Sequence, residues 1–184
     1  AEAIRETLND VNAVLDYPRH AALSATIDRM AFIQQIAALE AYFSDTLISL
    51  ILNDSDALAA AIERIPAIKN RQFTLSEYVA DPEIAKNTAA TYLRGLIYHN
   101  FDLIGSHWRA ILGFHIFPSS EIKSRMFKLL EIRHDCVHRN GKRKDGIFRY
   151  EVDRSFVDIV DQDIRRIVDH VEENLEMRLL FSDF

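Results

Sequence analysis

Residues 118–141 have the sequence PSSEIKSRMFKLLEIRHDCVHRNG. Pro118, Ser119 and Glu121 are residue types that begin helices, and the Asn140-Gly141 pair is typical of a helix end. Apolar side chains recur between them at the spacing of one helical face. The stretch therefore predicts a helix over residues 120–139 with well-defined ends.

The rest of the chain follows the same pattern. We expect further helices over residues 2–16, 21–52, 57–65, 82–99, 102–114 and 155–179. Residues 67–79 are ambiguous, with a short turn capped by Thr74 or Ser76, and residues 147–152 allow a short extended piece. Five glycines and four prolines are too few for an all-β protein of 184 residues. The sequence predicts an all-α fold, a single-domain helical bundle over residues 1–184.

Composition narrows the class of protein. Apolar residues make up 48% of the chain, enough for a sizeable core. Cys136 is the only cysteine, so no disulfide can form within the chain, which fits a reducing compartment. The longest nearly unbroken apolar run, Leu47–Leu52, is far shorter than a bilayer crossing. No N-terminal signal pattern is visible, although the chain begins with Ala1. We expect a cytoplasmic protein without a membrane partner.

Charge is distributed unevenly. Between Lys123 and Arg154 there are ten basic and five acidic residues, so this window carries +5 in a chain of net charge −6. Four of its cations, Arg139, Lys142, Arg143 and Lys144, surround the predicted end of the 120–139 helix. They fit an anion-binding strip, and equally a solvated helix end and charged turn. The acidic residues from Asp158 to Glu176 are expected on the solvent face of the last helix.

One basic residue lies on the apolar face of the 120–139 helix. At about 100° per residue, Arg133 falls about 20° from Ile122. The apolar arc around it contains Ile122, Met126, Leu129, Cys136 and Val137. An arginine in a buried stripe costs several kcal/mol unless it is paired, so Arg133 requires an acidic partner or an exposed position.

One acidic residue is misplaced in the same way. Glu40 lies inside the broad apolar arc of the 21–52 helix, which contains Phe32, Ile33, Ile36, Leu39, Phe43, Leu47, Leu50 and Ile51. A Glu40–Arg133 ion pair neutralises both residues and fixes the direction of the guanidinium. Such a pair is either a structural device in the core, or it holds Arg133 at the edge of a cleft with part of its fork directed to an anion.

Two histidines flank Arg133. His134 and His138 are four residues apart and share one face of the helix. A pair at this spacing can bind zinc, but the remaining ligands of a metal site are not apparent, so we expect no metal and no cofactor. The other use is acid–base chemistry on a phosphate, because an imidazole exchanges protons near neutral pH and a fixed guanidinium binds phosphate.

The same helix geometry makes dimerisation a chemical expectation. Arg133 and His138 point about 140° apart on a straight helix, so one helix cannot easily close both onto one phosphate. A second copy, antiparallel across a two-fold axis, completes the site. We therefore expect a two-fold homodimer.

Residues 133–142, RHDCVHRNGK, resemble the signature of the HEPN superfamily of all-α proteins, in which Arg precedes His by four to six intervening residues near the end of a late helix. The polar His134 directly after Arg133 also fits that pattern. The resemblance is greatest to prokaryotic HEPN nucleases of the RiboL-PSP type, where a core-facing acid recurs in an early helix, as Glu40 does here. It covers about ten residues, Glu40 and the helical layout.

The resemblance implies a specific activity. HEPN nucleases are dimeric, metal-independent endoribonucleases in which the RNA's own 2′-hydroxyl attacks the neighbouring phosphate, leaving a 2′,3′-cyclic phosphate and a 5′-hydroxyl. His138 is then the acid or base, and Arg133 stabilises the scissile phosphate. His134 positions the phosphate or orients His138, and Glu40 holds Arg133. The resemblance further implies roles in phage defence or toxin–antitoxin systems, with an antitoxin or regulatory partner.

In this reading Arg139, Lys142, Arg143 and Lys144 follow the RNA backbone, and give affinity without base specificity. Two alternatives stay open. One is a non-catalytic HEPN module that binds a nucleotide, an RNA or a partner nucleotidyltransferase. The other is an unrelated metal-dependent hydrolase that uses His134 and His138, which a chelator would inactivate.

Overall fold

The computed structural model describes residues 1–18, 20–148 and 150–182. Its helices are α1 (Glu2–Asp16), α2 (Ala21–Asn53), α3 (Ser55–Arg64), α4 (Pro66–Lys69), α5 (Leu75–Ala80), α6 (Ile84–Arg94), α7 (Phe101–Leu112), α8 (Ser120–Arg139) and α9 (Arg154–Ser182). No strand occurs among these residues; the sole bridge pairs Lys142 with Phe148. The predicted all-α class is confirmed.

Most boundaries agree with the sequence expectations, and α1 and α8 have the bounds that were predicted. The ambiguous segment resolves into α4 and α5, and Thr74 rather than Ser76 caps α5 through a capping box with Glu77. The helix expected over 82–99 is shorter at both ends. Glu83 is its N-cap residue, and the helix ends at Arg94 because the chain turns at Gly95.

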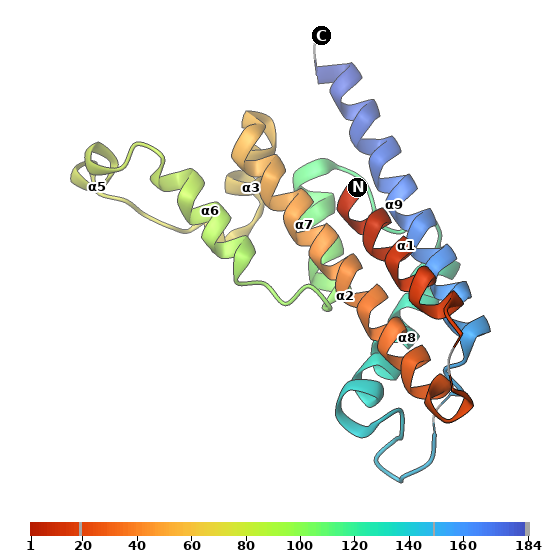
Figure 1. Cartoon of the computed structure of the whole chain (residues 1–184). Helices are drawn as coiled ribbons and strands as arrows, with labels where there is room; N and C mark the ends of the chain where they lie inside the picture. Colours follow the sequence, from red (N-terminus) through yellow and green to blue (C-terminus); the bar gives the residue numbers. More distant parts are fainter. Residues whose placement is uncertain (19, 149, 183–184) are drawn as a thin grey trace. The chain divides into compact units, whose positions relative to one another are not determined.

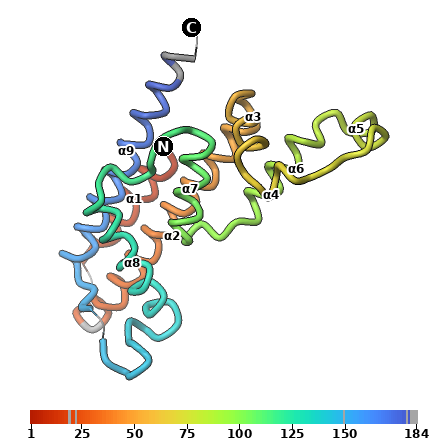
Figure 2. The backbone as a smooth tube through the Cα atoms, turned by 180° about the vertical axis from the view of Figure 1, so that it is seen from behind, coloured from red at the N-terminus to blue at the C-terminus, as the bar shows by residue number. Residues whose placement is uncertain are grey.

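The chain forms two compact units, Ala1–Tyr42 with Phe117–Phe184, and Phe43–Ile116. In the first unit, α1 and α9 lie side by side, and α8 lies beside the N-terminal part of α2 (Figures 1 and 2). Its core is apolar, with fully buried Leu8, Phe32, Ile36, Ile164 and Val171. The edge-to-face contact of Phe32 with Phe156, at 5.2 Å between ring centroids, joins α2 to α9.

Ion pairs also join the helices of this unit. Arg125 of α8 holds Asp163 of α9 with two hydrogen bonds, Nε–Oδ2 at 2.7 Å and Nη2–Oδ1 at 2.8 Å. Asp163 is 3% exposed and Asp161 is 7% exposed. The expectation that the acids of the last helix all face solvent is therefore wrong for these two residues, because arginine partners compensate their burial.

The second unit is built around α3, which packs on α4, α6 and α7. Trp108 of α7 is fully buried and contacts Phe43 and Phe114 edge to face. α5 buries no residue, and every residue from Arg71 to Ala80 is exposed. Figures 1 and 2 show α5 at the end of an arm, residues 70–83, that begins after α4, labelled in Figure 2, and leads back into α6.

α2 is unusually apolar for its length. Its segment Leu23–Asn53 is long and apolar enough to cross a membrane by length and composition, with a mean hydropathy of 1.3 in its most apolar window. A helix packed in a protein core meets the same criterion, and Phe32, Ile36, Leu39, Phe43, Leu47 and Ile51 are fully buried. The longest apolar run, Leu47–Leu52, is short because polar residues are interspersed along α2. The length of that run therefore gave too low a measure of how apolar the whole helix is.

Candidate functional site

The candidate site lies on α8, whose ends are fixed by local interactions. Ser119 caps the N-terminus, since its Oγ accepts the N–H of Ile122 at 3.2 Å. At the C-terminus Asn140 and Gly141 adopt left-handed backbone with φ of 53° and 87°, and the Gly141 N–H donates to the Asp135 carbonyl at 2.9 Å. The predicted Asn140-Gly141 cap is confirmed, and it fixes where the helix stops after His138.

Gly141 is also required by packing. A Cβ atom at this position would lie 3.1 Å from Cδ of Arg29 and 3.5 Å from the ring of Phe148. The α8 end therefore lies close to Arg29 of α2 and to Phe148 of the turn that follows, and a larger residue at position 141 would require a neighbouring side chain to shift.

The expected ion pair between the two core-facing helices is present. Nη2 of Arg133 lies 3.8 Å from Oε1 of Glu40, and the two side chains are 24% and 17% exposed. This separation is an electrostatic contact and is longer than a hydrogen bond. The buried Nε of Arg133 has no hydrogen-bond acceptor within the described part of the chain. The terminal nitrogens of Arg133 make no hydrogen bond to a described residue either, so Glu40 orients the guanidinium and leaves donors for another acceptor.

The two histidines lie beside this arginine on the outer side of α8. His134 and His138 are both exposed, and their ring centroids are 4.6 Å apart with the planes tilted by 51°. Exposure keeps both imidazoles within reach of a ligand from solvent. The site thus combines a half-buried guanidinium with two accessible imidazoles, the side chain most often used as a general acid or base.

Two members of the α8 apolar arc differ from each other in burial. Cys136 is 7% exposed, and burial raises the pKa of its thiol, which suits a core residue and not a nucleophile. Val137, expected inside the arc, is 44% exposed. It lies at the edge of the buried face, on the side that Arg133 and His134 occupy.

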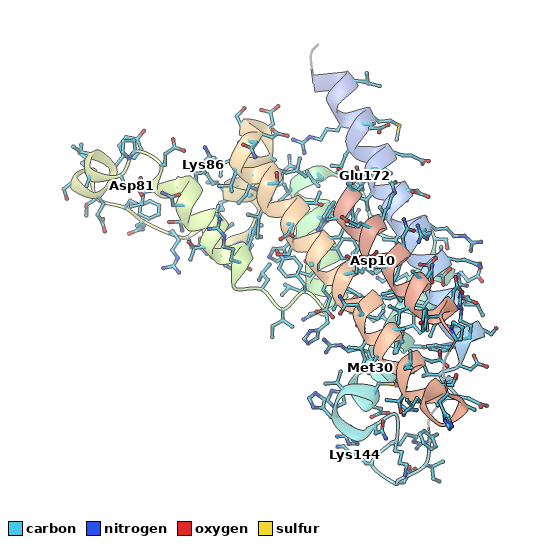
Figure 3. All side chains as sticks on the ribbon, viewed as in Figure 1. Asp10, Met30, Asp81, Lys86, Lys144 and Glu172 are labelled. Atoms are coloured by element: carbon cyan, nitrogen blue, oxygen red, sulfur yellow. The ribbon has the colours of Figure 1, made fainter. Side chains whose placement is uncertain are left out.

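The four cations assigned to RNA binding have different environments. Arg139 pairs with the buried carboxylate of Asp135 at 3.0 Å, and Arg143 pairs with Asp145 at 3.3 Å. Nζ of Lys142 lies 5.4 Å from the ring centroid of Phe148. Lys144 lies at the tip of the turn after α8 (Figure 3). The strip therefore carries less net charge than its four cations suggest, because two are balanced by acids.

Sequence reasoning missed Arg29. It lies eleven residues before Glu40 and thus on nearly the same face of α2, and its Cδ would lie 3.1 Å from a Cβ atom at position 141, close to the α8 end. Its Nη2 donates to Oγ1 of Thr26 at 3.1 Å. The sequence contains a signal for Arg29. A helical wheel of α2 that begins one residue before Met30 places Arg29 next to Glu40, as a second cation near this site.

Metal ligands do not gather at this site in sufficient number. Among the residues that the structure describes, no group of three or more His, Cys, Asp or Glu side chains could hold a metal ion. Comparisons with known protein families, with curated proteins and with solved structures give no match for this chain.

Proposed function

We propose that the chain is a HEPN-type endoribonuclease that cleaves RNA without a metal ion. The observation that carries the proposal is the Glu40–Arg133 contact at 3.8 Å, which fixes a half-buried guanidinium next to the exposed His134–His138 pair. A guanidinium with spare donors suits a phosphodiester oxygen. Two imidazoles suit the two proton transfers of transesterification.

The reaction proceeds as an in-line transfer within the RNA. A 2′-hydroxyl loses its proton to an imidazole and attacks the adjacent phosphorus. The bond from phosphorus to the 5′-oxygen breaks, and that oxygen takes a proton from an imidazolium, which balances the proton lost by the 2′-hydroxyl. The products are a 2′,3′-cyclic phosphate and a 5′-hydroxyl. Arg133 stabilises the charge that develops on the phosphate oxygens, and His138 is the acid–base group.

A second copy of the chain completes the site in this proposal. Arg133 and His138 diverge by about 140° around one helix, so the phosphate held by one copy meets His138 of the other. The 44% exposure of Val137, beside Arg133 on α8, supports an interface on this face, because apolar side chains are suited to contacts between copies.

The first experiment is incubation of total RNA with the protein in EDTA. We expect wild type to produce fragments with 2′,3′-cyclic phosphate ends, and His138→Ala to produce none. His99→Ala, which removes an exposed histidine of the other unit, is the control and should cleave like wild type. Cleavage by His138→Ala at the wild-type rate would refute the site. Absence of cleavage by every variant, combined with RNA binding, would favour a non-catalytic HEPN module.

Complementation tests the shared site. Arg133→Ala and His138→Ala are each expected to be inactive. When the two are mixed and allowed to exchange subunits, half of the dimers are mixed and one of their two sites has both wild-type groups, so about a quarter of wild-type activity should return. No recovery despite proven exchange would mean that each chain carries a whole site.

A further inference from the structure

A pocket in the Phe43–Ile116 unit is unconnected with the candidate site on α8. It has a volume of about 570 Å³, within the usual range for small-molecule sites. One side is α6 and the start of the turn after it; the other is α4 and the first part of the arm. The lining residues are Ala67, Arg71, Phe73, Ile84, Asn87, Thr88, Thr91, Tyr92, Gly95 and Leu96.

The sequence of α6 makes this pocket polar on one wall. Its buried face consists of Ala89, Ala90 and Leu93. The pocket is lined from the opposite side of the helix by Ile84, Thr88 and Thr91, which are spaced three and four residues apart and so share one face. α6 therefore buries small apolar side chains on one side and presents hydroxyl groups to the pocket on the other.

The lining contains one charged side chain and no carboxylate. This charge belongs to Arg71, whose guanidinium makes no hydrogen bond or ion pair within the described part of the chain. Asp81, which contacts the lining residue Asn87, has both oxygens engaged, by the Glu83 N–H and by Nδ2 of Asn87, each at 3.0 Å. In a chain of net charge −6, an unpaired cation in a pocket free of acids selects for an anion.

Hydroxyl groups add uncommitted hydrogen-bond capacity near this cation. The hydroxyls of Thr88 and Thr91 make no hydrogen bond to any described residue, although each lines the pocket. A hydroxyl can donate to an anionic oxygen, so these groups and Arg71 suit the same chemical group on a ligand.

Two aromatic side chains provide a flat apolar wall. Phe73 is 40% exposed although it lines the pocket. Tyr92 is held in place by the buried His107: its ring stacks on the imidazole with 5.7 Å between centroids and 15° between planes. The imidazole Nδ1 lies 2.9 Å from the Leu103 carbonyl, which only accepts, so Nδ1 carries the proton and Nε2 accepts from the Tyr92 hydroxyl at 2.9 Å. The stacking contact and this hydrogen bond therefore fix the orientation of the Tyr92 ring.

We propose that this pocket binds a small organic anion that joins a flat apolar ring to a carboxylate or phosphate group. The ring packs against Phe73 and Tyr92, and the anionic group binds Arg71 and the threonine hydroxyls. This site is independent of the proposed ribonuclease activity, because every residue that forms it belongs to the other unit.

The test uses 2-naphthoate, 2-naphthyl phosphate and the neutral 2-naphthamide as probes, with amide chemical shifts of the full-length protein as the readout. We expect at least one anion to shift the amides of Thr88, Thr91 and Tyr92, with a dissociation constant of about 1 mM, the value that the ligand efficiency of such small molecules gives. The neutral amide should bind about fivefold more weakly, because it lacks the charge-assisted contact. The stronger of the two anions identifies the preferred group.

Three variants separate the contributions. Arg71→Gln should make the anion and the amide bind equally, and Thr91→Phe should fill the pocket and abolish binding of both. Arg94→Gln, which removes an exposed cation of α6 outside the lining, should change neither. Anions that bind elsewhere, or an Arg71→Gln variant that keeps the preference for the anion, would overturn the proposal. Arg71 and Thr91 are exposed, so both variants should keep the wild-type fold. Their amide spectra will show whether they do.

Discussion

Replacing Glu40 by Gln removes one charge from the Glu40–Arg133 pair and leaves a half-buried arginine. Two unit charges 3.8 Å apart attract by about 4 kcal/mol at an effective dielectric constant of about 20. The net effect is smaller, because the two side chains are 24% and 17% exposed and the contact is longer than a hydrogen bond. We expect Glu40→Gln to lower the free energy of unfolding by about 1–2 kcal/mol. For a chain of this size that loss lowers Tm by about 2–8 °C.

A double-mutant cycle with Arg133→Gln measures the pair itself. The free energies of unfolding of wild type, the two single variants and the double variant come from urea denaturation followed by circular dichroism. We expect a coupling energy of about 1–2 kcal/mol, with the double variant more stable than the sum of the single effects predicts. A coupling energy at or below about 0.5 kcal/mol, the usual error of additivity, would refute the pairing as the reason for these two residues on core-facing helices.

Three further outcomes follow from the structure. Arg125→Ala should cost about 2–4 kcal/mol, since it removes two hydrogen bonds from the buried carboxylate of Asp163 and leaves it only the longer contact with Arg166 at 3.6 Å, and Asp163→Asn in the same chain should recover part of that loss in urea denaturation. Gly141→Ala should cost about 1–2 kcal/mol because φ is 87° and Cβ would crowd Arg29, whereas Gly105→Ala, inside α7 with only 3.7 Å contacts, should raise Tm. Burial lowers the pKa of His107 from its ordinary value of 6.5, so the unfolded chain binds a proton that the folded chain resists, and stability should fall as the pH drops below about 6.5.

Each of these outcomes has a contrary result. An Arg125→Ala variant as stable as wild type would mean that the Arg125–Asp163 pair contributes no net stability, with Arg166 or water compensating the carboxylate. If Gly141→Ala and Gly105→Ala changed the stability equally, the positive φ of Gly141 could not be the cause of the loss. For His107, the measurement is the loss of stability between pH 7 and pH 5, which should be smaller in His107→Gln than in wild type; an identical loss would mean that other groups govern this range.

The helical fold was predictable because its signals are local. Ser119, Asn140 and Gly141 mark the ends of α8 by residue type alone, and the structure has the same bounds. The arm was not predictable to the same extent. α5 buries no side chain, so it has no periodic apolar pattern, and only the capping pair Thr74 and Glu77 indicates it.

At the candidate site, the helical wheels predicted a pair that depends on tertiary structure. Arg133 and Glu40 each lie on the apolar face of a helix, where burying an isolated charge costs free energy. That cost is reduced if the two form an ion pair, so the wheels predicted the pair. The closer pair of Arg125 with Asp163, at 2.7 and 2.8 Å, was not predictable in this way, because Asp163 belongs to a run of acids that resembles a solvent face in the sequence. A helical wheel shows which face of α8 Val137 occupies, but it does not show how far neighbouring elements cover that face, and Val137 is 44% exposed.

The Asn140-Gly141 cap also bears on the chemical ageing of the chain. Asn followed by Gly is prone to deamidation, in which the glycine nitrogen attacks the asparagine side-chain carbonyl and ammonia leaves. Here that nitrogen donates its N–H to the Asp135 carbonyl at 2.9 Å, and the left-handed backbone of Asn140 is fixed by the helix end. As long as α8 remains capped, the cyclisation is hindered. Fraying of the last turn would permit it, water would then open the cyclic imide, and the new carboxylate would lie next to Arg139 in the chain.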